Sequence, residues 1–447
     1  MRKKKIIVGN RFYNKYKTLD TALNAIDNQG IIVLPSGTFS CSEFNINTKK
    51  ITIRGQDNTV IQLVEGASIR LDDFSELVIE NLKIVQTGTV PLLDCYNNSQ
   101  LKINNCQLEG AAMMNHHTGQ FAPVISLHKS TCQIKQTTFN SQINDGILVD
   151  QSNLSVIKSN LLNTERYSIN GYDSEINVMD SDIRSVYLSR SKFVGNSNNF
   201  KQSISSLFAL KAENNSQVDL ELTTLENCYN GFYLGKNTTL TSKQLASATI
   251  HEHFLFIGKN AVASLVNGTV KKQLDENFYN SSTKPFIDVQ GGQLSIDNYE
   301  FLSINAELLT AKNADITLNN ISAVCDAHSL ILDNTVAKLC KVHTDANIIS
   351  DNSKIACHSC KIISDTTPYS FILHNSSVYN VFKNEEHLEP SAIYSVNSDT
   401  HFNHPVKIYN ENNKIQIDRL LYGNQFEKLH DYTDSKKLPF DFSIDVI

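Results

Sequence analysis

A short pattern that returns about every 18 to 24 residues constrains this chain more than any other feature of its sequence. Each repeat has a short apolar run, such as Phe371-Ile372-Leu373, followed by a polar turn, such as His374-Asn375-Ser376. A repeat of this length indicates a solenoid, in which each unit buries its apolar face against the next unit. We call the recurring polar position the corner column: Asn98, Lys129, Gln151, Asp173, Ser191, Asn215, Asn237, Asn260, Gly291, Asn313, Asn334, Asn352, Asn375 and Asn397.

Apolar or small residues recur at positions +3, +5, +8 and +10 from the corner column. Alternation with period two is typical of a strand with one face in the core, and the step from +5 to +8 requires a bend. The repeat therefore predicts an all-β fold, a single parallel β-helix of about fourteen coils. Two examples of the pattern are Leu101, Ile103, Cys106 and Leu108 after Asn98, and Ile316, Leu318, Ile321 and Ala323 after Asn313.

The preference for Asn at the corner has a physical reason. Asn tolerates the left-handed backbone conformation of a tight corner, and its side chain forms local hydrogen bonds. Since each coil stacks on the previous one, we also expect Asn side chains of successive coils to bond one another.

The two ends of the chain differ from the repeats. Residues 16–26 have helical spacing, with Leu19, Leu23 and Ile26 on one face. We therefore predict an N-terminal cap at 1–40, with a helix covering the open sheet edge and a first strand. The β-helix is predicted for 41–410, and a C-terminal cap or tail for 411–447, where the pattern fades.

Two steps in the column are too long for one coil. The excess falls near residues 110–121 and 267–284, where we predict loops that leave the solenoid. Loops on a rigid scaffold often carry function. The first loop contains His116 and His117, which we regard as candidate ligand-binding residues because histidine serves as a base or a metal ligand.

Composition excludes several classes of protein. The net charge of -6 and the absence of a basic face argue against nucleic-acid binding. No apolar stretch approaches the roughly 18 residues of a membrane span, and only three apolar residues follow the basic run Arg2–Lys5. We therefore expect no membrane span, no signal peptide and a cytoplasmic location with reduced cysteines. Signal-independent export and surface assembly remain alternatives.

The N-terminal segment "YKTLDTALNAIDNQGIIVLPSGTF" (residues 16–39) resembles the opening of the pectate-lyase-like superfamily, and "ITIRG" (51–55) is similar to its next strand. The resemblance implies a right-handed parallel β-helix with an N-terminal capping helix. It does not imply one function, since that superfamily includes lyases, hydrolases, epimerases, esterases, adhesins and non-catalytic scaffolds.

A polysaccharide lyase would need a base and cations that stabilise an enolate. The best matching cluster is Asp145, Asp150, Arg166, Asp173 and Arg184. These are the candidate catalytic residues, although solvated corner residues explain them equally well. We expect no cofactor, and Ca²⁺ only if the protein is lyase-like.

Two other carbohydrate-active alternatives have partial motifs. Asn144-Asp145-Gly146 resembles the polygalacturonase acid motif but lacks its companion motifs, and a glycosidase needs paired carboxylates. Ser168–Ser174 resembles the alginate-epimerase motif but lacks the Pro-His that should follow Asp173.

The cysteines and the basic residues have simple explanations. Cys357 and Cys360 occupy inward +5 and +8 positions, whereas Cys340 occupies the outward +6 position, so we predict core cysteines and no zinc site. A line of cations beside the corner is a candidate contact for an anionic polymer or an acidic protein, or simply a solvated edge. It consists of Arg190, Lys236, Lys259 and Lys312.

The leading hypothesis from the sequence is a non-catalytic binding or scaffold protein that contacts a polysaccharide or a protein partner. The alternatives are a carbohydrate-active enzyme (lyase, epimerase or hydrolase) and an architectural component of a secretion or cell-surface assembly.

Overall fold

A computed structural model of the chain divides into two compact units, Met1–Glu226 (unit 1) and Asn227–Ile447 (unit 2). The described residues are 4–9, 15–110, 114–115, 120–140, 145–164, 166–201, 207–272, 284–304, 306–325, 329–345, 347–358, 360–362, 371–381, 391–396, 398–402, 406–411 and 441–443. Strands dominate both units, and the described part of the chain contains a single helix.

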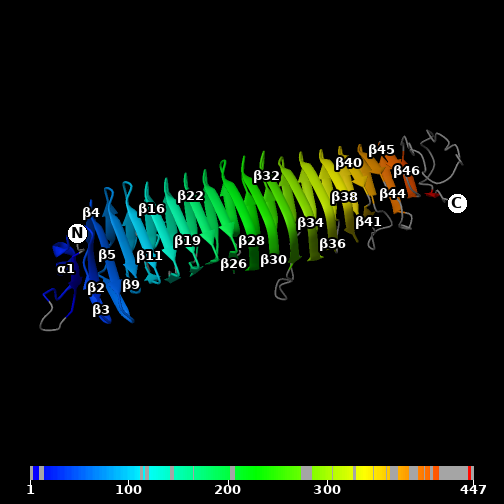
Figure 1. The fold of residues 1–447 in the computed structure, drawn as a ribbon. Helices are drawn as coiled ribbons and strands as arrows, with labels where there is room; N and C mark the ends of the chain where they lie inside the picture. The colour runs from blue at the N-terminus through cyan, green and yellow to red at the C-terminus, as the bar shows by residue number, and fades with distance from the viewer. Residues whose placement is uncertain are drawn as a thin grey trace. The chain divides into compact units, whose positions relative to one another are not determined.

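Unit 1 is a stack of short parallel strands (Figure 1). The strands that precede each corner form one sheet, the pre-corner sheet: β4 (Phe44–Asn47), β7 (Ile69–Asp72), β10 (Leu93–Cys95), β15 (Ile125–His128), β18 (Ile147–Asp150), β21 (Ile169–Tyr172), β24 (Val186–Ser189) and β27 (Phe208–Glu213). The strands of the other sheet, the post-corner sheet, are β1 (Lys5–Ile7), β2 (Gly30–Leu34), β3 (Gly37–Cys41), β5 (Lys50–Gly55), β6 (Thr59–Leu63), β8 (Glu76–Glu80), β9 (Lys83–Val85), β11 (Gln100–Asn104), β12 (Gln107–Glu109), β16 (Thr131–Lys135), β17 (Thr138–Asn140), β19 (Asn153–Ile157), β20 (Asn160–Asn163), β22 (Glu175–Met179), β23 (Asp182–Ile183), β25 (Lys192–Asn196), β26 (Asn199–Lys201) and β28 (Gln217–Cys228).

Unit 2 has the same two kinds of strand, but several coils merge the two post-corner strands into one long strand. Its pre-corner strands are β29 (Asn230–Leu234), β31 (Leu255–Ile257), β33 (Ile287–Gln290), β35 (Leu309–Lys312), β37 (Leu330–Asp333), β39 (Ile348–Asp351), β42 (Phe371–His374), β44 (Ser391–Val396) and β46 (Val406–Glu411). Its post-corner strands are β30 (Thr239–Ile250), β32 (Val262–Lys272), β34 (Gln293–Ile304), β36 (Asp315–Cys325), β38 (Val336–Thr344), β40 (Lys354–His358), β41 (Lys361–Ile362), β43 (Ser377–Val381) and β45 (Asp399–Phe402).

Strands of successive coils pair in parallel throughout both units, as the pairs β18–β21 and β35–β37 illustrate. This pairing confirms the predicted parallel β-solenoid. The pairing also explains the Val, Ile and Leu content of the inward positions, because β-branched and aliphatic residues pack well on a pleated, buried face.

The corner column is where the backbone becomes left-handed. Asn98, Asp173 and Asn313 have φ values of 62°, 49° and 51°. Among the column residues that the structure describes, one assignment was wrong: in the coil after Asp173 the left-handed residue is Arg190 (φ 50°), and the following residue, Ser191, is buried. Asn397 lies outside the described residues. The bend predicted between +5 and +8 is confirmed as a second left-handed residue at +7: Asn105, Gln136, Lys158, Asp180, Ser197, Leu222, Gln244, Asn267, Asn298, Asn320 and Lys341.

The predicted inward positions form the core. All four such residues after Asn98 and after Asn313 are buried. Cys357 and Cys360 are buried and Cys340 is half-buried, as their register predicted. No disulfide joins any of the nine cysteines, all of which lie within the described residues. Burial raises the pKa of Cys132, a second reason to treat the inward cysteines as packing residues.

Two hydrogen-bonded ladders join the coils. Stacked Asn side chains bond one another, as predicted: Asn334 Nδ2 donates to Asn313 Oδ1 at 2.6 Å, and Asn298 Nδ2 donates to Asn267 Oδ1 at 2.6 Å. A ladder of buried hydroxyls at position +1 was not predicted. In it Ser152 Oγ accepts from the backbone N–H of Ser130 at 2.9 Å and donates to the Asp150 carbonyl at 2.6 Å. These bonds satisfy backbone groups that the tight corner leaves outside the strand pairing.

The N-terminal helix is α1 (Leu19–Ala25), which begins with a capping box between Thr18 and Thr21. Leu19, Leu23 and Ile26 are buried, as their spacing predicted. Strand β1 pairs with β2, so part of the edge that the helix was expected to cover is occupied by a strand. That α1 caps the solenoid, and the limits of the cap and tail at 40 and 411, stay predictions.

The predicted loops fall largely outside the described residues. Within 110–121, a short antiparallel pair joins β13 (Met114–Asn115) and β14 (Gln120–Phe121). Within 267–284, residues up to Lys272 belong to β32, and 273–283 lie outside the described part. At the other end, β47 (Asp441–Ser443) pairs antiparallel with β46. None of the described helical segments is long and apolar enough to cross a membrane.

Candidate functional site

A polar and aromatic surface covers the outward face of the pre-corner sheet of unit 1. Successive side chains of a strand point to opposite faces, so every second residue of these strands faces outward. The outward residues align from strand to strand in two rows about 4.8 Å per step. Row one is Arg70, Asp94, Ser126, Leu148, Asn170, Tyr187 and Lys211, and row two is Asp72, Tyr96, His128, Asp150, Tyr172, Ser189 and Glu213.

His128 lies at the centre of a hydrogen-bonded chain on this face. Its Nε2 is 2.9 Å from Ser126 Oγ, on the same strand, and its Nδ1 is 3.2 Å from Asp150 Oδ2, on the next strand. Ser126 forms the floor of the face at 3% exposure, while the side chains of His128 and Asp150 are 32% and 38% exposed. The chain therefore links a nearly buried hydroxyl through an imidazole to a solvated carboxylate.

Tyr96 stacks flat on the His128 ring, with ring centroids 4.9 Å apart and an interplanar angle of 11°. The Arg70 guanidinium lies 4.4 Å from the centroid of Tyr96 and bonds Asp72 at 3.2 Å. Burial and the neighbouring Asp94 raise the pKa of Tyr96 to about 12. Stacking and cation–π contacts together hold the plane of the imidazole against the sheet.

Asp94 is the most unfavourably placed carboxyl on this face. Burial raises its pKa, and the hydroxyls of Tyr96 and Ser126 oppose that rise only in part. Its Oδ1 atom is buried and has no hydrogen-bond partner among the described residues. The fold therefore favours the protonated form of Asp94 more than the unfolded chain does.

We expect Asp94→Asn to stabilise unit 1 at pH 7 to 8, by roughly 1–3 °C in Tm. Because the folded pKa lies above the ordinary 3.8, wild-type stability falls as pH rises from the ordinary value through the raised one. Asparagine cannot ionise, so the gain should shrink as pH is lowered toward 4. Thermal unfolding at several pH values measures this difference, and a gain that is unchanged at pH 4 would contradict the assignment.

Three tyrosines form a second aromatic group on the same face. Tyr187 lies between Tyr167 and Tyr172, with centroid distances of 5.5 and 5.7 Å. Its hydroxyl donates to Glu213 at 2.9 Å, and Glu213 also pairs with Lys211 at 3.1 Å. Burial, followed by that hydrogen bond, raises the pKa of Tyr187. The hydroxyl thus stays protonated and its ring orientation is set by the carboxylate.

Asp145 lies at the opposite end of strand β18 from Asp150. It accepts hydrogen bonds from the Tyr167 backbone N–H at 3.1 Å and from Asn170 Nδ2 at 3.0 Å, and Arg166 Nε is 3.8 Å away. The other side-chain atom of Asn170, Oδ1, is buried without a partner among the described residues. Asp145 therefore positions Asn170 of row one, and each of its two carboxylate oxygens accepts a hydrogen bond.

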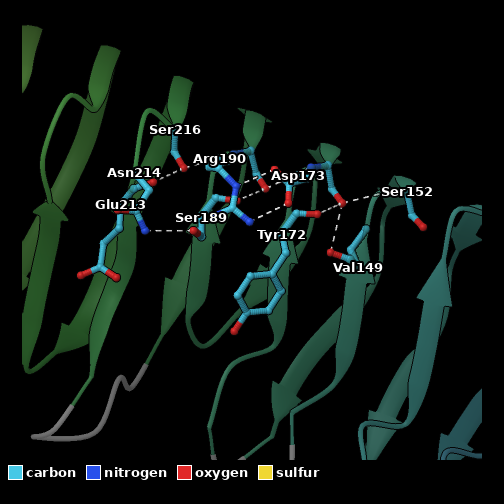
Figure 2. A network of polar contacts seen from close by, with 11 residues as sticks. Val149, Ser152, Tyr172, Asp173, Ser189, Arg190, Glu213, Asn214 and Ser216 are labelled. Atoms are coloured by element: carbon cyan, nitrogen blue, oxygen red, sulfur yellow. Dashed lines mark hydrogen bonds and ion pairs between the residues drawn. The ribbon is translucent and has the colours of Figure 1, made fainter.

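Asp173 and Arg190 form a two-pronged ion pair at the corner (Figure 2). Arg190 Nε and Nη2 each donate to one Asp173 oxygen at 2.7 Å. This pairing lowers the pKa of Asp173, and it raises that of Arg190, to which Asp150 adds a smaller contribution. A bidentate pair engages both oxygens of the carboxylate and leaves it little capacity to act as a base.

The structure divides the predicted catalytic cluster among different partners. Asp145 pairs with Arg166, Asp150 with His128, and Asp173 with Arg190. Arg184 donates to the Thr164 carbonyl at 2.9 Å, and its buried Nε has no partner among the described residues. The three carboxylates have three different partners, and no group of three or more His, Cys, Asp or Glu side chains that could hold a metal ion occurs among the described residues. A role for Ca²⁺ stays a prediction.

The cations that were predicted to contact a ligand belong to different units. Lys236 and Lys259 lie on neighbouring coils of unit 2, Gln290 stands next to Lys312, and Lys312 pairs with Asp333 at 2.9 Å. Arg190 belongs to unit 1. A ligand-binding role for these cations stays a prediction, and His116 and His117 lie outside the described residues.

Unit 2 has a shallow depression of about 490 Å³ over the +7 bend of β30, β32, β34, β36 and β38. Its floor includes Asn267, Asn298 and Asn320, whose amides are bonded to one another. Those side chains have few groups left for a ligand, so the outward face of unit 1 is the better candidate site.

Sequence reasoning missed the central residues of this face, which are Asp94, Tyr96, Ser126, His128 and Tyr187. A signal was present, because each is a polar or aromatic residue that alternates with apolar ones just before a corner, as in Ile125-Ser126-Leu127-His128. Tabulating the outward residues before the corner, as well as those after it, would have revealed both rows.

No protein-family model and no curated protein matches this chain. Among solved structures, it is similar to a family 28 exopolygalacturonase of Yersinia enterocolitica, with 9% identity over 87% of this chain and 79% of that chain and a TM-score of 0.30. The mannuronan C-5 epimerase A-module of Azotobacter vinelandii matches at 10% identity over 90% and 94% of the two chains, with a TM-score of 0.29. The tailspike protein of E. coli bacteriophage HK620 matches at 12% identity over 88% and 78%, with a TM-score of 0.31.

These values transfer no residue role and no activity to this chain. The strand pairing is what confirms the parallel β-helix implied by the resemblance to the pectate-lyase-like superfamily. The function must be argued from the side chains on the outward face of unit 1.

Proposed function

We propose that the outward face of the pre-corner sheet of unit 1 binds a neutral polysaccharide. The observation that carries the proposal is the combination of Tyr172 and Tyr187 with acids and the amide of Asn170 in two regular rows. A sugar ring has apolar C–H faces and a rim of hydroxyl groups. Aromatic rings that contact the faces, together with a few fixed polar groups that bond the rim, are what such a ligand requires.

The charges on this face favour a neutral ligand over a polyanion. Its cations are paired with carboxylates: Arg70 with Asp72, Lys211 with Glu213, Arg190 with Asp173, and Arg166 with Asp145. A polyuronate would have to break these pairs and would meet Asp94 and Asp150 as well. The same pairing counts against a polyuronate lyase, which needs cations free to stabilise an enolate.

The dimensions of the face favour a polymer. Seven strands about 4.8 Å apart give each row a length of about 29 Å. This is longer than a single sugar, so several sugar units in succession can contact the rows. A repeating scaffold presents repeating contacts, which suits a repeating ligand.

Binding to a panel of neutral and acidic polysaccharides, measured by affinity electrophoresis, tests the proposal. We expect Tyr187→Ala and Tyr172→Ala to weaken binding of a neutral polymer at least about tenfold, which corresponds to roughly 1.4 kcal/mol. Tyr233→Ala is the matched control, because Tyr233 is an outward tyrosine of the pre-corner sheet in unit 2, stacked on Phe256 at 4.7 Å.

The proposal fails if wild type binds no polymer of the panel, or if Tyr187→Ala and Tyr233→Ala bind alike. A stoichiometric protein partner recovered with wild type, together with no polysaccharide binding, would support the scaffold hypothesis instead. Preference for acidic polymers would contradict the charge argument.

A further inference from the structure

Ser126, His128 and Asp150 have the connectivity of a serine nucleophile, its base and the carboxylate that orients the base. The hydroxyl contacts Nε2 at 2.9 Å and the carboxylate contacts Nδ1 at 3.2 Å, on opposite sides of the imidazole. With the ring hydrogen on Nδ1, the imidazole donates to Asp150 and leaves Nε2 free to accept the serine proton. Asp94 is the second partner of the Ser126 hydroxyl, and in its protonated form it donates to Oγ and leaves the serine proton for Nε2.

Register explains why these residues meet. Ser126 and His128 are two positions apart on β15, so both face outward, and His128 aligns with Asp150 on β18. Tyr96 stacks on a face of the His128 ring and restricts rotation of the imidazole. Ser189, an outward serine of the same sheet, instead contacts Asn214 Nδ2 at 3.1 Å, so a serine at such a position does not by itself produce this arrangement.

We propose that Ser126 is the nucleophile of an ester hydrolase, with His128 as its general base and acid and Asp150 as a positioning residue. The substrate class is an O-acylated saccharide. The choice of a saccharide as the alcohol part rests on the proposed polysaccharide binding, whereas the ester chemistry rests on the three side chains alone.

The reaction proceeds in two balanced halves. Ser126 Oγ forms a bond to the acyl carbon while its proton moves to His128 Nε2, and the bond from that carbon to the saccharide oxygen then breaks as Nε2 returns the proton to the leaving hydroxyl. Water next adds to the acyl carbon and gives a proton to Nε2. The bond to Oγ breaks, Ser126 recovers the proton, and a carboxylic acid leaves.

The closing experiment uses the full chain, with p-nitrophenyl acetate as substrate and a fluorophosphonate as a covalent probe of the serine. We expect wild type to hydrolyse the ester and to carry the probe on Ser126, as located by peptide mass spectrometry. Ser126→Ala should lose the label, and Ser126→Ala and His128→Gln should each lose about 10²–10⁴-fold in kcat.

Asp150 needs a measurement that a structural role would not change. Asp150→Asn should lower kcat and leave KM within about twofold, because it alters the orientation of the base and not ester binding. Asp150→Glu should restore part of kcat.

Ser155→Ala and His358→Gln are matched controls on post-corner strands β19 and β40, and both should retain wild-type turnover and labelling. Circular dichroism checks that every variant is folded. An unlabelled Ser126 in folded wild type, or equal turnover by wild type and Ser126→Ala, overturns the inference.

The small ester separates this inference from the proposed function. Turnover that depends on Ser126, in a protein that binds no polysaccharide, would reject the saccharide ligand and keep the hydrolase. Polysaccharide binding without such turnover or labelling would keep the ligand and reject the hydrolase.

Discussion

Phe254→Ala is expected to lower the free energy of unfolding of unit 2 by about 3–5 kcal/mol. Phe254 is fully buried and lies between Phe232 and Phe286, with centroid distances of 5.9 Å to each. The Phe301 ring is T-shaped to it, with a centroid distance of 6.2 Å. Alanine would remove contacts with three coils at once. Backbone hydrogen bonds hold those coils in place, so the cavity can collapse only in part.

Denaturant unfolding followed by far-ultraviolet circular dichroism measures this loss, since the chain has no Trp for fluorescence. Hydrogen exchange then locates it in the coils around residue 254. Phe256→Ala is the matched control, because Phe256 is half-buried on the outward face and, among the described residues, stacks on Tyr233 alone. The control variant should lower the free energy of unfolding by about 0.2–1 kcal/mol. Equal losses of unfolding free energy for the two variants would refute the account of the core.

Gly146→Ala is expected to destabilise unit 1 by about 1–3 kcal/mol through overpacking. A Cβ atom at this position would lie 2.6 Å from the Ser168 carbonyl oxygen of the next coil. That oxygen accepts the Ile147 N–H at 3.0 Å, so relieving the contact strains a hydrogen bond worth about 1 kcal/mol. Backbone on both sides of the contact is held in parallel pairing and cannot move cheaply.

The same change should disturb the candidate site, because Gly146 is adjacent to Asp145 and immediately precedes strand β18, which ends at Asp150. We expect weaker polysaccharide binding as well as a lower unfolding midpoint. Gly110→Ala is the comparison, since its Cβ would approach a side-chain atom of Leu92 at 3.3 Å and no backbone atom so closely. If the two variants unfold at the same denaturant concentration, the backbone clash at Gly146 is not the cause.

The coil geometry was predictable because it repeats. Each coil places a left-handed residue at the corner and apolar residues at +3, +5, +8 and +10. Because every coil repeats this pattern, each one adds evidence for the same fold. The single misplaced corner could have been corrected from the same pattern. Counted from Arg190, positions +3 and +10 are Phe193 and Phe200, both buried, whereas counted from Ser191 they are Val194 and Lys201.

The site was harder to predict because the number of residues at the corner varies. Asn97 and Asn98 are both left-handed (φ 51° and 62°), so Tyr96 stands two residues before its corner residue, whereas His128 stands one before Lys129. Counting back from the column therefore does not align Tyr96 with His128. The extra left-handed residue Asn214 before Asn215 has the same effect for Glu213.

The sequence by itself determined the repeating coil, the two faces of each strand and the inward place of the cysteines, because these depend on period-two alternation within one coil. It also supplied Asp145, Asp150 and Asp173 as members of one candidate cluster, with Asp150 and Asp173 at or next to the corner one coil apart. Only the tertiary structure decided which residues of different coils touch, because that depends on corner lengths and side-chain rotamers. It separated the three acids among different partners, and it placed Ser126, His128 and Asp150 in one hydrogen-bonded line.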